Sequence, residues 1–238
     1  MHRLFYSHLN FTFQISPFFR RGIKGGAALL LILSSTGYAE EPEIDLDLGE
    51  EIHEVCAGCH GEYAQGGKQG EYPRLAGFPP KYLARQLKLF KHNERKNIPM
   101  RPYANERELP DEDIPSITVY ISQIKLITSM PVFDKDMPAY EKLLIAKKVF
   151  NIPRTEGNIA HGKKFYKTEC RSCHGRDGKG KKNSIIPPLS GQYTQYLAKQ
   201  LRAFARGERE HDDDADFFAE MSQEEIRDLL AYLSVTDD

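Results

Sequence analysis

The chain has 238 residues, a formal net charge of −1, 28% charged residues and 40% hydrophobic residues. A charge this close to zero excludes a strongly basic nucleic-acid binder, so we expect no nucleic-acid partner. The composition is that of a soluble globular protein, and the length suits one large domain or two small ones.

Residues 1–39 differ from the rest of the chain. The stretch "FFRRGIK" is basic, "GGAALLLIL" is apolar, and "TGYA" offers a small-residue cleavage site ending at Ala39. We predict a signal peptide over residues 1–39 and export to the periplasm. The apolar stretch is shorter than the roughly 20 residues that cross a bilayer, so contact with a membrane is expected only through partner complexes or an uncleaved leader.

The four cysteines all lie in two copies of Cys-x-x-Cys-His. The first copy holds Cys56 and Cys59, the second holds Cys170 and Cys173, and no cysteine is left over for a disulfide. This motif attaches c-type haem, because two thiols add to the vinyl groups and the adjacent histidine reaches the iron. Two such pairs could build one four-thiolate zinc site, but the gap of about a hundred residues and the trailing histidines do not favour it. A redox-active dithiol does not require the histidines either. We therefore predict two covalently attached haem c groups.

The two motifs belong to an internal repeat. At an offset of 114 residues, 17 of the 40 positions from Cys56 to Arg95 are identical. The segments "PRLAGFPPKYLARQLKLF" and "PPLSGQYTQYLAKQLRAF" pair without a gap, with apolar residues at helical spacing. Two further helices are expected in "LPDEDIPSITVYISQI" and "MSQEEIRDLLAYLSV", which pair at an offset of 112. The repeat predicts one all-α domain over residues 43–126 and a second over 158–236.

Residues 127–157 form the predicted linker. Prolines mark turns at both ends of this segment, and "AYEKLLIAKKVF" has the pattern of a short helix. We expect this linker to pack along both domains.

On these motifs the chain resembles a tandem dihaem class I cytochrome c, a soluble periplasmic electron-transfer family. The resemblance covers Glu43 to Val235 and includes Pro-x-Leu-x-Gly at Pro73 and at Pro187. It implies that His60 and His174 bind the two irons. It also implies that carbonyl groups near the two prolines accept the other imidazole N–H of each histidine.

The sixth ligand of the first iron is expected to be Met100. This residue lies 40 positions beyond His60 in a loop restricted by prolines. A thioether ligand suits haem iron and raises its reduction potential. The alternative is that Met100 only packs in the core and His92 binds the iron. A solvated surface position suits His92 better.

The second domain has no methionine at the equivalent position. His211 lies near the vacant place, 37 positions beyond His174, so we expect two histidine ligands at the second iron. The alternatives are a surface role for His211, ligation by Met221, Met130 or Met137, or an iron with no sixth ligand. The two remaining histidines near the motifs, His53 and His161, are expected at the surface.

These expectations favour a periplasmic carrier that relays single electrons between respiratory redox partner proteins, without being an enzyme. The second iron should have the lower potential, because it lacks a thioether ligand. The lysines around the second motif could orient an acidic partner, although such a run is more often a solvated face. The alternative function is a haem enzyme, or a sensor of gas or peroxide, that uses an open sixth site on the second haem.

Overall fold

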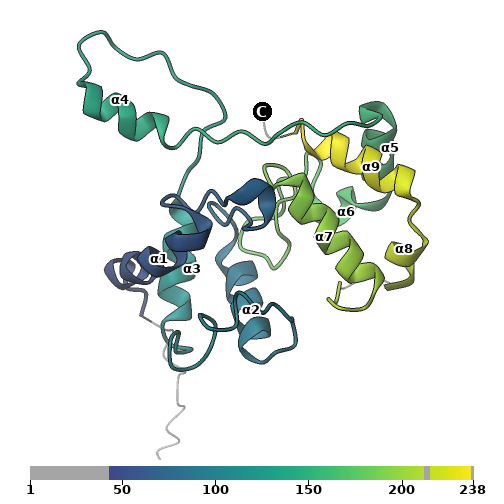
Figure 1. Cartoon of the computed structure of the whole chain (residues 1–238), viewed down its shortest axis with the longest axis horizontal. Coiled ribbons are helices and arrows are strands. Elements are labelled where there is room, and N and C mark those ends of the chain that lie inside the picture. The colour runs from purple at the N-terminus through teal and green to yellow at the C-terminus, as the bar shows by residue number, and fades with distance from the viewer. Residues whose placement is uncertain (1–42, 212–214, 237–238) are drawn as a thin grey trace, which may run out of the picture. The chain divides into compact units, whose positions relative to one another are not determined.

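The computed structural model describes residues 43–211 and 215–236, so the predicted signal peptide lies outside the described residues. In this part of the chain all regular structure is helical apart from two isolated β-bridges. Figure 1 shows the helices as two groups joined by a long connection that carries a helix of its own. None of the described helices is long and apolar enough to cross a membrane.

The first domain is built from three α-helices and one short 3-10 helix. Their bounds are α1 Leu46–His60, η1 Lys68–Gly70, α2 Pro80–Lys91 and α3 Ile114–Gln123. Helix α1 starts at an Asp45 side chain that accepts the backbone N–H groups of Asp47 and Leu48. Apolar faces of the helices meet in a core that includes Phe78, Leu83 and Ile117.

The second domain repeats this arrangement with α5 Ile159–Glu169, α6 Arg171–His174, α7 Thr194–Ala205, α8 Ala215–Glu220 and α9 Gln223–Leu233. Its core includes Tyr166, Leu197, Leu229 and Leu233. Helix α9 begins with a capping box in which the Ser222 and Glu225 side chains each accept from the other's backbone N–H. The helices expected from the apolar pattern are therefore present in both copies.

A glycine sets the crossing of the first and last helices in each domain. A side chain at Gly49 of α1 would meet the carbonyl oxygen of Ser116 on α3 at 2.6 Å. At Gly162 of α5, the corresponding obstacle is the carbonyl oxygen of Asp228 on α9. These positions allow the two backbones to approach closely, and this contact holds the haem-binding motif against the domain core.

The second motif helix differs from the first by one residue. Gly49 precedes Cys56 by seven positions, whereas Gly162 precedes Cys170 by eight. Helix α1 runs unbroken to its histidine, but the equivalent stretch is divided at Cys170, where φ is −110° and α5 gives way to α6. The extra residue explains this break. In both domains the glycine lies at the helix crossing and the histidine bonds the proline carbonyl, so a stretch that is one residue longer has to leave the regular helix between them.

The linker helix α4 spans Ala139–Ala146, and none of its residues is buried. It carries the exposed apolar side chains Tyr140 and Leu143. The expectation that this segment packs along both domains is wrong for α4, which projects away from the helices of both groups in Figure 1. The later part of the linker does contact both domains, since the buried ring of Phe150 packs against Arg74 of the first domain and Tyr193 of the second.

Candidate haem sites

The first motif occupies the end of α1. Cys56, Cys59 and His60 all lie within its last two turns, and Gly61 then ends the helix with a φ of 82°. A residue with a side chain is strained in that conformation, so the motif is followed by glycine for a conformational reason. The backbone returns at once, because the N–H of Gly66 donates to the carbonyl of His60 at 2.7 Å.

The second motif ends in the same way. Cys173 and His174 lie on α6, and Gly175 ends that helix with a φ of 87°. The N–H of Gly180 donates to the carbonyl of His174 at 2.9 Å. Both motifs are thus presented by equivalent turns of chain, despite the break at Cys170.

The histidines of the two motifs have matching hydrogen bonds. His60 Nδ1 lies 2.9 Å from the carbonyl oxygen of Pro73, and His174 Nδ1 lies 3.0 Å from that of Pro187. A carbonyl oxygen only accepts, so each Nδ1 carries the proton and each neutral ring keeps its lone pair on Nε2. Burial lowers the pKa of both rings, which favours this neutral form. The expected support from the proline carbonyls is confirmed.

One cysteine of each motif is strongly shielded from water. Burial raises the pKa of the Cys56 thiol to about 11 and that of Cys170 to about 12. In the folded chain without haem, both groups are protonated thiols at neutral pH. They are therefore half-buried neutral thiols rather than reactive surface thiolates.

A cavity of about 410 Å³ opens beside the second motif and reaches α2 of the first domain. This volume falls within the range of roughly 300–1,000 Å³ that is usual for cofactor sites. Its walls are mostly apolar; among the lining residues are Ile186, Leu189, Leu197, Leu201, Leu230 and Leu233. The thiols of Cys170 and Cys173 for covalent attachment, an unprotonated imidazole nitrogen for the iron and an apolar wall for the macrocycle together fit haem c.

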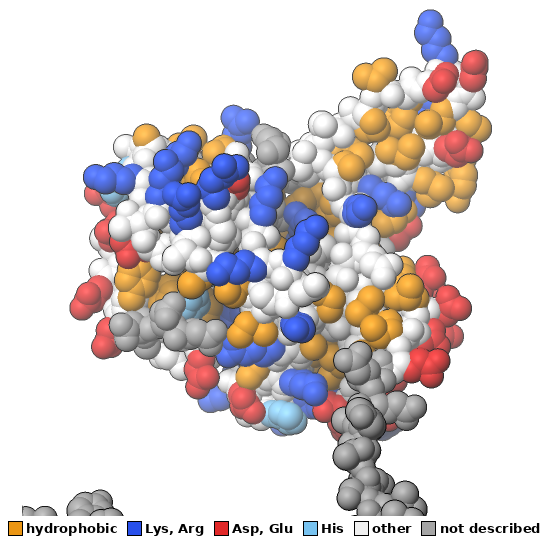
Figure 2. Space-filling model, turned by 180° about the vertical axis from the view of Figure 1, so that it is seen from behind, with side chains coloured by type: hydrophobic (Ala, Val, Ile, Leu, Met, Phe, Trp, Pro, Cys, Tyr) orange, Lys and Arg blue, Asp and Glu red, His pale blue; other side chains and the backbone are white. Residues whose placement is uncertain are grey.

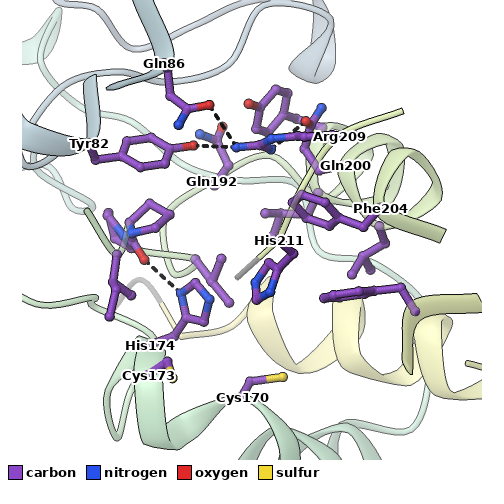
Figure 3. A pocket seen from close by; sticks show the side chains of 18 of the residues that line it. Tyr82, Gln86, Cys170, Cys173, His174, Gln192, Gln200, Phe204, Arg209 and His211 are labelled. Atoms are coloured by element: carbon purple, nitrogen blue, oxygen red, sulfur yellow. Dashed lines mark hydrogen bonds between the residues drawn. The ribbon is translucent and has the colours of Figure 1, made fainter. Parts of the chain in front are cut away.

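The structure brings His211 to this cavity. Its ring centre lies 6.2 Å from that of His174, and Figure 3 shows both rings pointing into the same space. The His211 ring packs against Phe204 and Phe218, with ring centres 5.0 and 4.8 Å away. Metal–imidazole bonds are about 2 Å long and a ring centre lies about 1 Å further, so one metal between two imidazoles separates their centres by about 6 Å. The spacing of His174 and His211 fits that arrangement.

The residues weighed against His211 lie elsewhere. Met221 is only 9% exposed and belongs to the hydrophobic core of the second domain. Met130 is 55% exposed in the linker, and Met137 is half-buried there. None of these three lines the cavity.

Met100 is half-buried in the loop after α2. Its backbone organises the loop, since its carbonyl accepts the N–H groups of Tyr103 and Ala104. The assignment of Met100 to the first iron stays a prediction. The alternative ligand His92 ends α2 with its side chain 58% exposed, facing Glu94.

His53 is not a surface residue, contrary to expectation. Only 4% of it is exposed, its Nε2 lies 3.1 Å from the carbonyl oxygen of Glu62, and its ring contacts that of Tyr120. The close crossing of α1 and α3 at Gly49 explains this burial, because it presses the face of α1 that carries His53 against α3.

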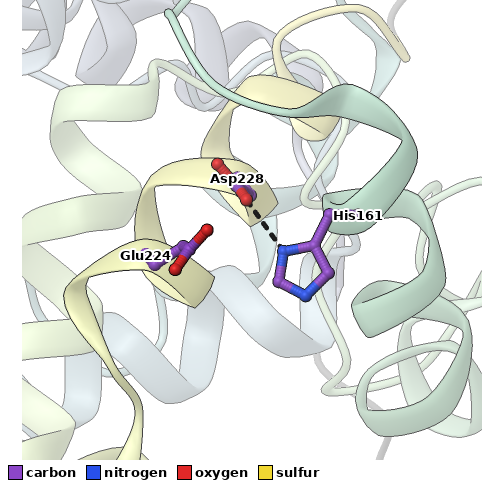
Figure 4. Close-up of side chains that lie close together, drawn as sticks. All are labelled: His161, Glu224 and Asp228. Atoms are coloured by element: carbon purple, nitrogen blue, oxygen red, sulfur yellow. Dashed lines mark hydrogen bonds and ion pairs between the residues drawn. The ribbon is translucent and has the colours of Figure 1, made fainter.

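His161 is partly exposed and belongs to a joint between α5 and α9. Its Nδ1 lies 2.8 Å from Asp228, as Figure 4 shows, and Glu224 lies nearby. The buried Asp228 carboxylate also accepts the backbone N–H of Asn158 and the guanidinium of Arg227. These donors, the Asn158 backbone N–H first among them, hold the pKa of Asp228 down at about 2. The carboxylate is fully used in tying the two helices together, so we assign this cluster a structural role.

A polar cluster between the two domains was not expected from the sequence. Arg95, which is 9% exposed, donates to Gln86 of its own domain and to Tyr196 and Gln200 of the other. Figure 3 shows part of the cluster at one edge of the cavity.

Arg209 makes the equivalent contacts from the second domain to the first. It donates to Gln200 of its own domain and to Tyr82 and Gln86 of the first domain. Each member has an identical residue 114 positions away. The available sequence signal was therefore the identity of these polar residues between the two repeats, in α2 and α7 and in the loops that follow them.

A family model for cytochrome c matches this chain twice, over residues 46–125 and 159–237. Cytochrome c4 from Pseudomonas aeruginosa is 30% identical over 211 residues, which are 87% of this chain and 95% of the relative. A thiosulfate dehydrogenase electron acceptor from Stutzerimonas stutzeri is 31% identical over 187 residues, covering 76% of this chain and 78% of the relative.

Two solved structures share the fold. Reduced cytochrome c4 from Pseudomonas stutzeri gives a TM-score of 0.62 at 24% identity, with 81% of this chain and 98% of that chain covered. A thiosulfate dehydrogenase from Marichromatium purpuratum gives 0.62 at 26% identity, over 80% of this chain but 40% of that longer one. With a family match over each repeat and a haem-attachment motif in each match, the chain belongs to the cytochrome c family as a tandem dihaem class I cytochrome c.

Proposed function

We propose that this cytochrome relays single electrons between two redox partner proteins in the periplasm, with His60 and Met100 as ligands of the first iron and His174 and His211 as ligands of the second. The observation that carries the proposal is the separation of 6.2 Å between the His174 and His211 ring centres. The bound haems supply one-electron redox chemistry. The chain supplies the attachment thiols, the axial ligands and the apolar walls that exclude water.

The described residues support a carrier better than an enzyme at the second site. An enzyme or a sensor needs an open sixth position on the second iron, so no side chain able to bind iron may face His174. Here His211 faces His174 from the loop after α7, held between Phe204 and Phe218. This position argues against the alternative of a haem enzyme or a sensor of gas or peroxide.

A spectroelectrochemical titration of the intact protein tests the proposal. Different sixth ligands give the two irons different potentials, with the bis-histidine iron lower. We expect two resolved one-electron waves, both from low-spin haem. One unresolved wave from two irons with identical spectra would contradict the proposed pair of ligand sets.

A narrower candidate for the donor comes from the relatives. The Stutzerimonas stutzeri protein, and another from Thiomonas intermedia that is 29% identical, are named as electron acceptors of thiosulfate dehydrogenase. This similarity favours an enzyme that oxidises a sulfur compound as the electron donor. Mixing the oxidised cytochrome with a thiosulfate dehydrogenase and thiosulfate should reduce it within the enzyme's turnover time, and no reduction would exclude this donor.

A further inference from the structure

The two motif segments carry opposite charges although they descend from one repeat. From the helix cap to the loop after the motif, residues 45–68 contain six acidic residues and one basic residue. The equivalent residues 158–182 contain eight basic and two acidic residues. The formal charge is therefore −5 around the first haem-attachment motif and +6 around the second.

These charges lie at the surface. The acidic set consists of Asp45, Asp47, Glu50, Glu51, Glu54 and Glu62, and all are exposed. The basic set consists of Lys163, Lys164, Lys167, Arg171, Arg176, Lys179, Lys181 and Lys182, and all are exposed as well. Figure 2 shows Lys and Arg side chains gathered over the second domain and a separate group of Asp and Glu side chains on the first.

Few of these charges are neutralised within the described part of the chain. Among Lys, Arg, Asp and Glu side chains of the two segments, ion pairs join Glu62 to Lys147, Lys68 to Glu71, and Arg176 to Asp177. Lone surface charges are screened within about 8 Å at physiological salt, but a group of six like charges produces a field that acts on an approaching protein.

We propose that the basic surface of the second domain docks an acidic electron donor and that the acidic surface of the first domain docks a basic electron acceptor. This inference rests on the proposed function, because the order of the partners follows from the ligands. The domain with two histidine ligands has the lower potential, so it is the end at which an electron enters. The donor loses one electron at the second domain, and the acceptor gains one at the first.

Two charge-reversal variants test the two surfaces separately. Lys163→Glu with Lys167→Glu inverts part of the basic surface, and Glu51→Lys with Glu54→Lys inverts part of the acidic one. Lys199→Glu with Arg202→Glu is the matched control for the basic surface, since these exposed residues lie on α7 of the second domain and their reversal changes the net charge by the same amount as that of Lys163 and Lys167. Neutral versions of each pair, with glutamine, serve if a reversed variant does not fold.

The probes are reduced flavodoxin as the acidic donor and a mitochondrial cytochrome c as the basic acceptor, both followed by stopped flow at low salt. The variant at Lys163 and Lys167 should slow reduction by flavodoxin about tenfold, a size typical of electrostatic steering, and leave transfer to cytochrome c unchanged. The variant at Glu51 and Glu54 should show the reverse pattern. Salt should remove both effects, and the control should have neither.

The outcomes distinguish a failure of the proposed function from a failure of the docking surfaces. If the native protein exchanges electrons with neither probe, the proposed function fails. If it exchanges with both, but the control slows the reactions as much as the variants do, the docking surfaces are wrong. Salt-reversible dimers in sedimentation would also overturn the proposal, because a second copy of this chain would then occupy the two surfaces.

Discussion

Arg95 of the first domain and Gln200 of the second are joined by a hydrogen bond of 3.0 Å in a buried cluster between the domains. Arg209 returns the contact to Gln86 at 3.1 Å. The duplication that produced two haem-binding domains thus also produced a near-symmetric contact between them. Because these residues border the cavity beside His174, the contact fixes one domain against the other next to the second haem site.

Replacing Arg95 with methionine should weaken this contact. The change keeps an apolar stem but removes the donor to the Tyr196 hydroxyl and one of the two donors to Gln200, which keeps its bond from Arg209. This loss should cost about 2 kcal/mol. The free energy of unfolding, measured by denaturant titration, checks this value. Arg101→Met is the control, since Arg101 is exposed. Adding Arg209→Met should cost more than the sum of the two single changes, because either arginine alone still donates to both glutamines and only the double change leaves them without a buried donor; strict additivity would contradict a joint cluster.

Gly162→Ala should strongly destabilise the second domain. The new methyl group would collide with the backbone carbonyl of Asp228, so α5 and α9 would have to separate. We expect a loss of about 3 kcal/mol in thermal or denaturant unfolding. Gly58→Ala is the matched change in the motif helix of the first domain, where nothing lies within 4 Å, and it should not destabilise the protein. Equal effects of the two changes would rule out the proposed crossing.

Asp228 should make the second domain sensitive to acid. Its pKa is lowered from 3.8 to about 2 by the N–H of Asn158 and by His161 and Arg227. A carboxyl with a lowered pKa stabilises the fold above its unfolded pKa and loses that contribution as the pH falls through the folded value. Stability should therefore fall between about pH 4 and pH 2. Asp228→Asn should show a smaller fall over this range, and an unchanged pH profile would count against the role given to Asp228.

Replacing Met100 with leucine tests the ligand of the first iron. The ferric protein should lose the weak red absorption band of an iron–methionine bond, and the higher of the two potentials should fall because the thioether is gone. Met130→Leu is the control, since Met130 is 55% exposed in the linker. A red band that survives in the Met100 variant would assign the ligand elsewhere.

The sequence was sufficient for the helices and for the parts of the site that lie near one another in the chain. The repeat predicted matching domains because apolar residues recur at helical spacing in both copies. The carbonyls of Pro73 and Pro187 were predictable because each lies 13 residues from its histidine, within one loop. The proximity of His211 to His174 followed from its place in the shortened loop.

Contacts between separate helices were harder to predict. The burial of His53 depends on the crossing angle of α1 and α3, which is set by a glycine on one helix and the backbone of the other. The cluster around Arg95 and Arg209 depends on which helix faces meet across the domain boundary. Periodicity identifies an apolar face, but it does not say which polar residues beside that face will meet another domain.

Carbon monoxide binding to the reduced protein, with and without His211→Ala, shows whether His211 occupies the sixth position of the second iron. If His211 binds the second iron, the native protein should bind no carbon monoxide at that haem, and the variant should bind one equivalent with a shifted optical spectrum. His92→Ala is the matched histidine control and should behave as the native protein does. Ready binding of carbon monoxide to the second haem of the native protein, unchanged by His211→Ala, would contradict the proposed pair of histidine ligands.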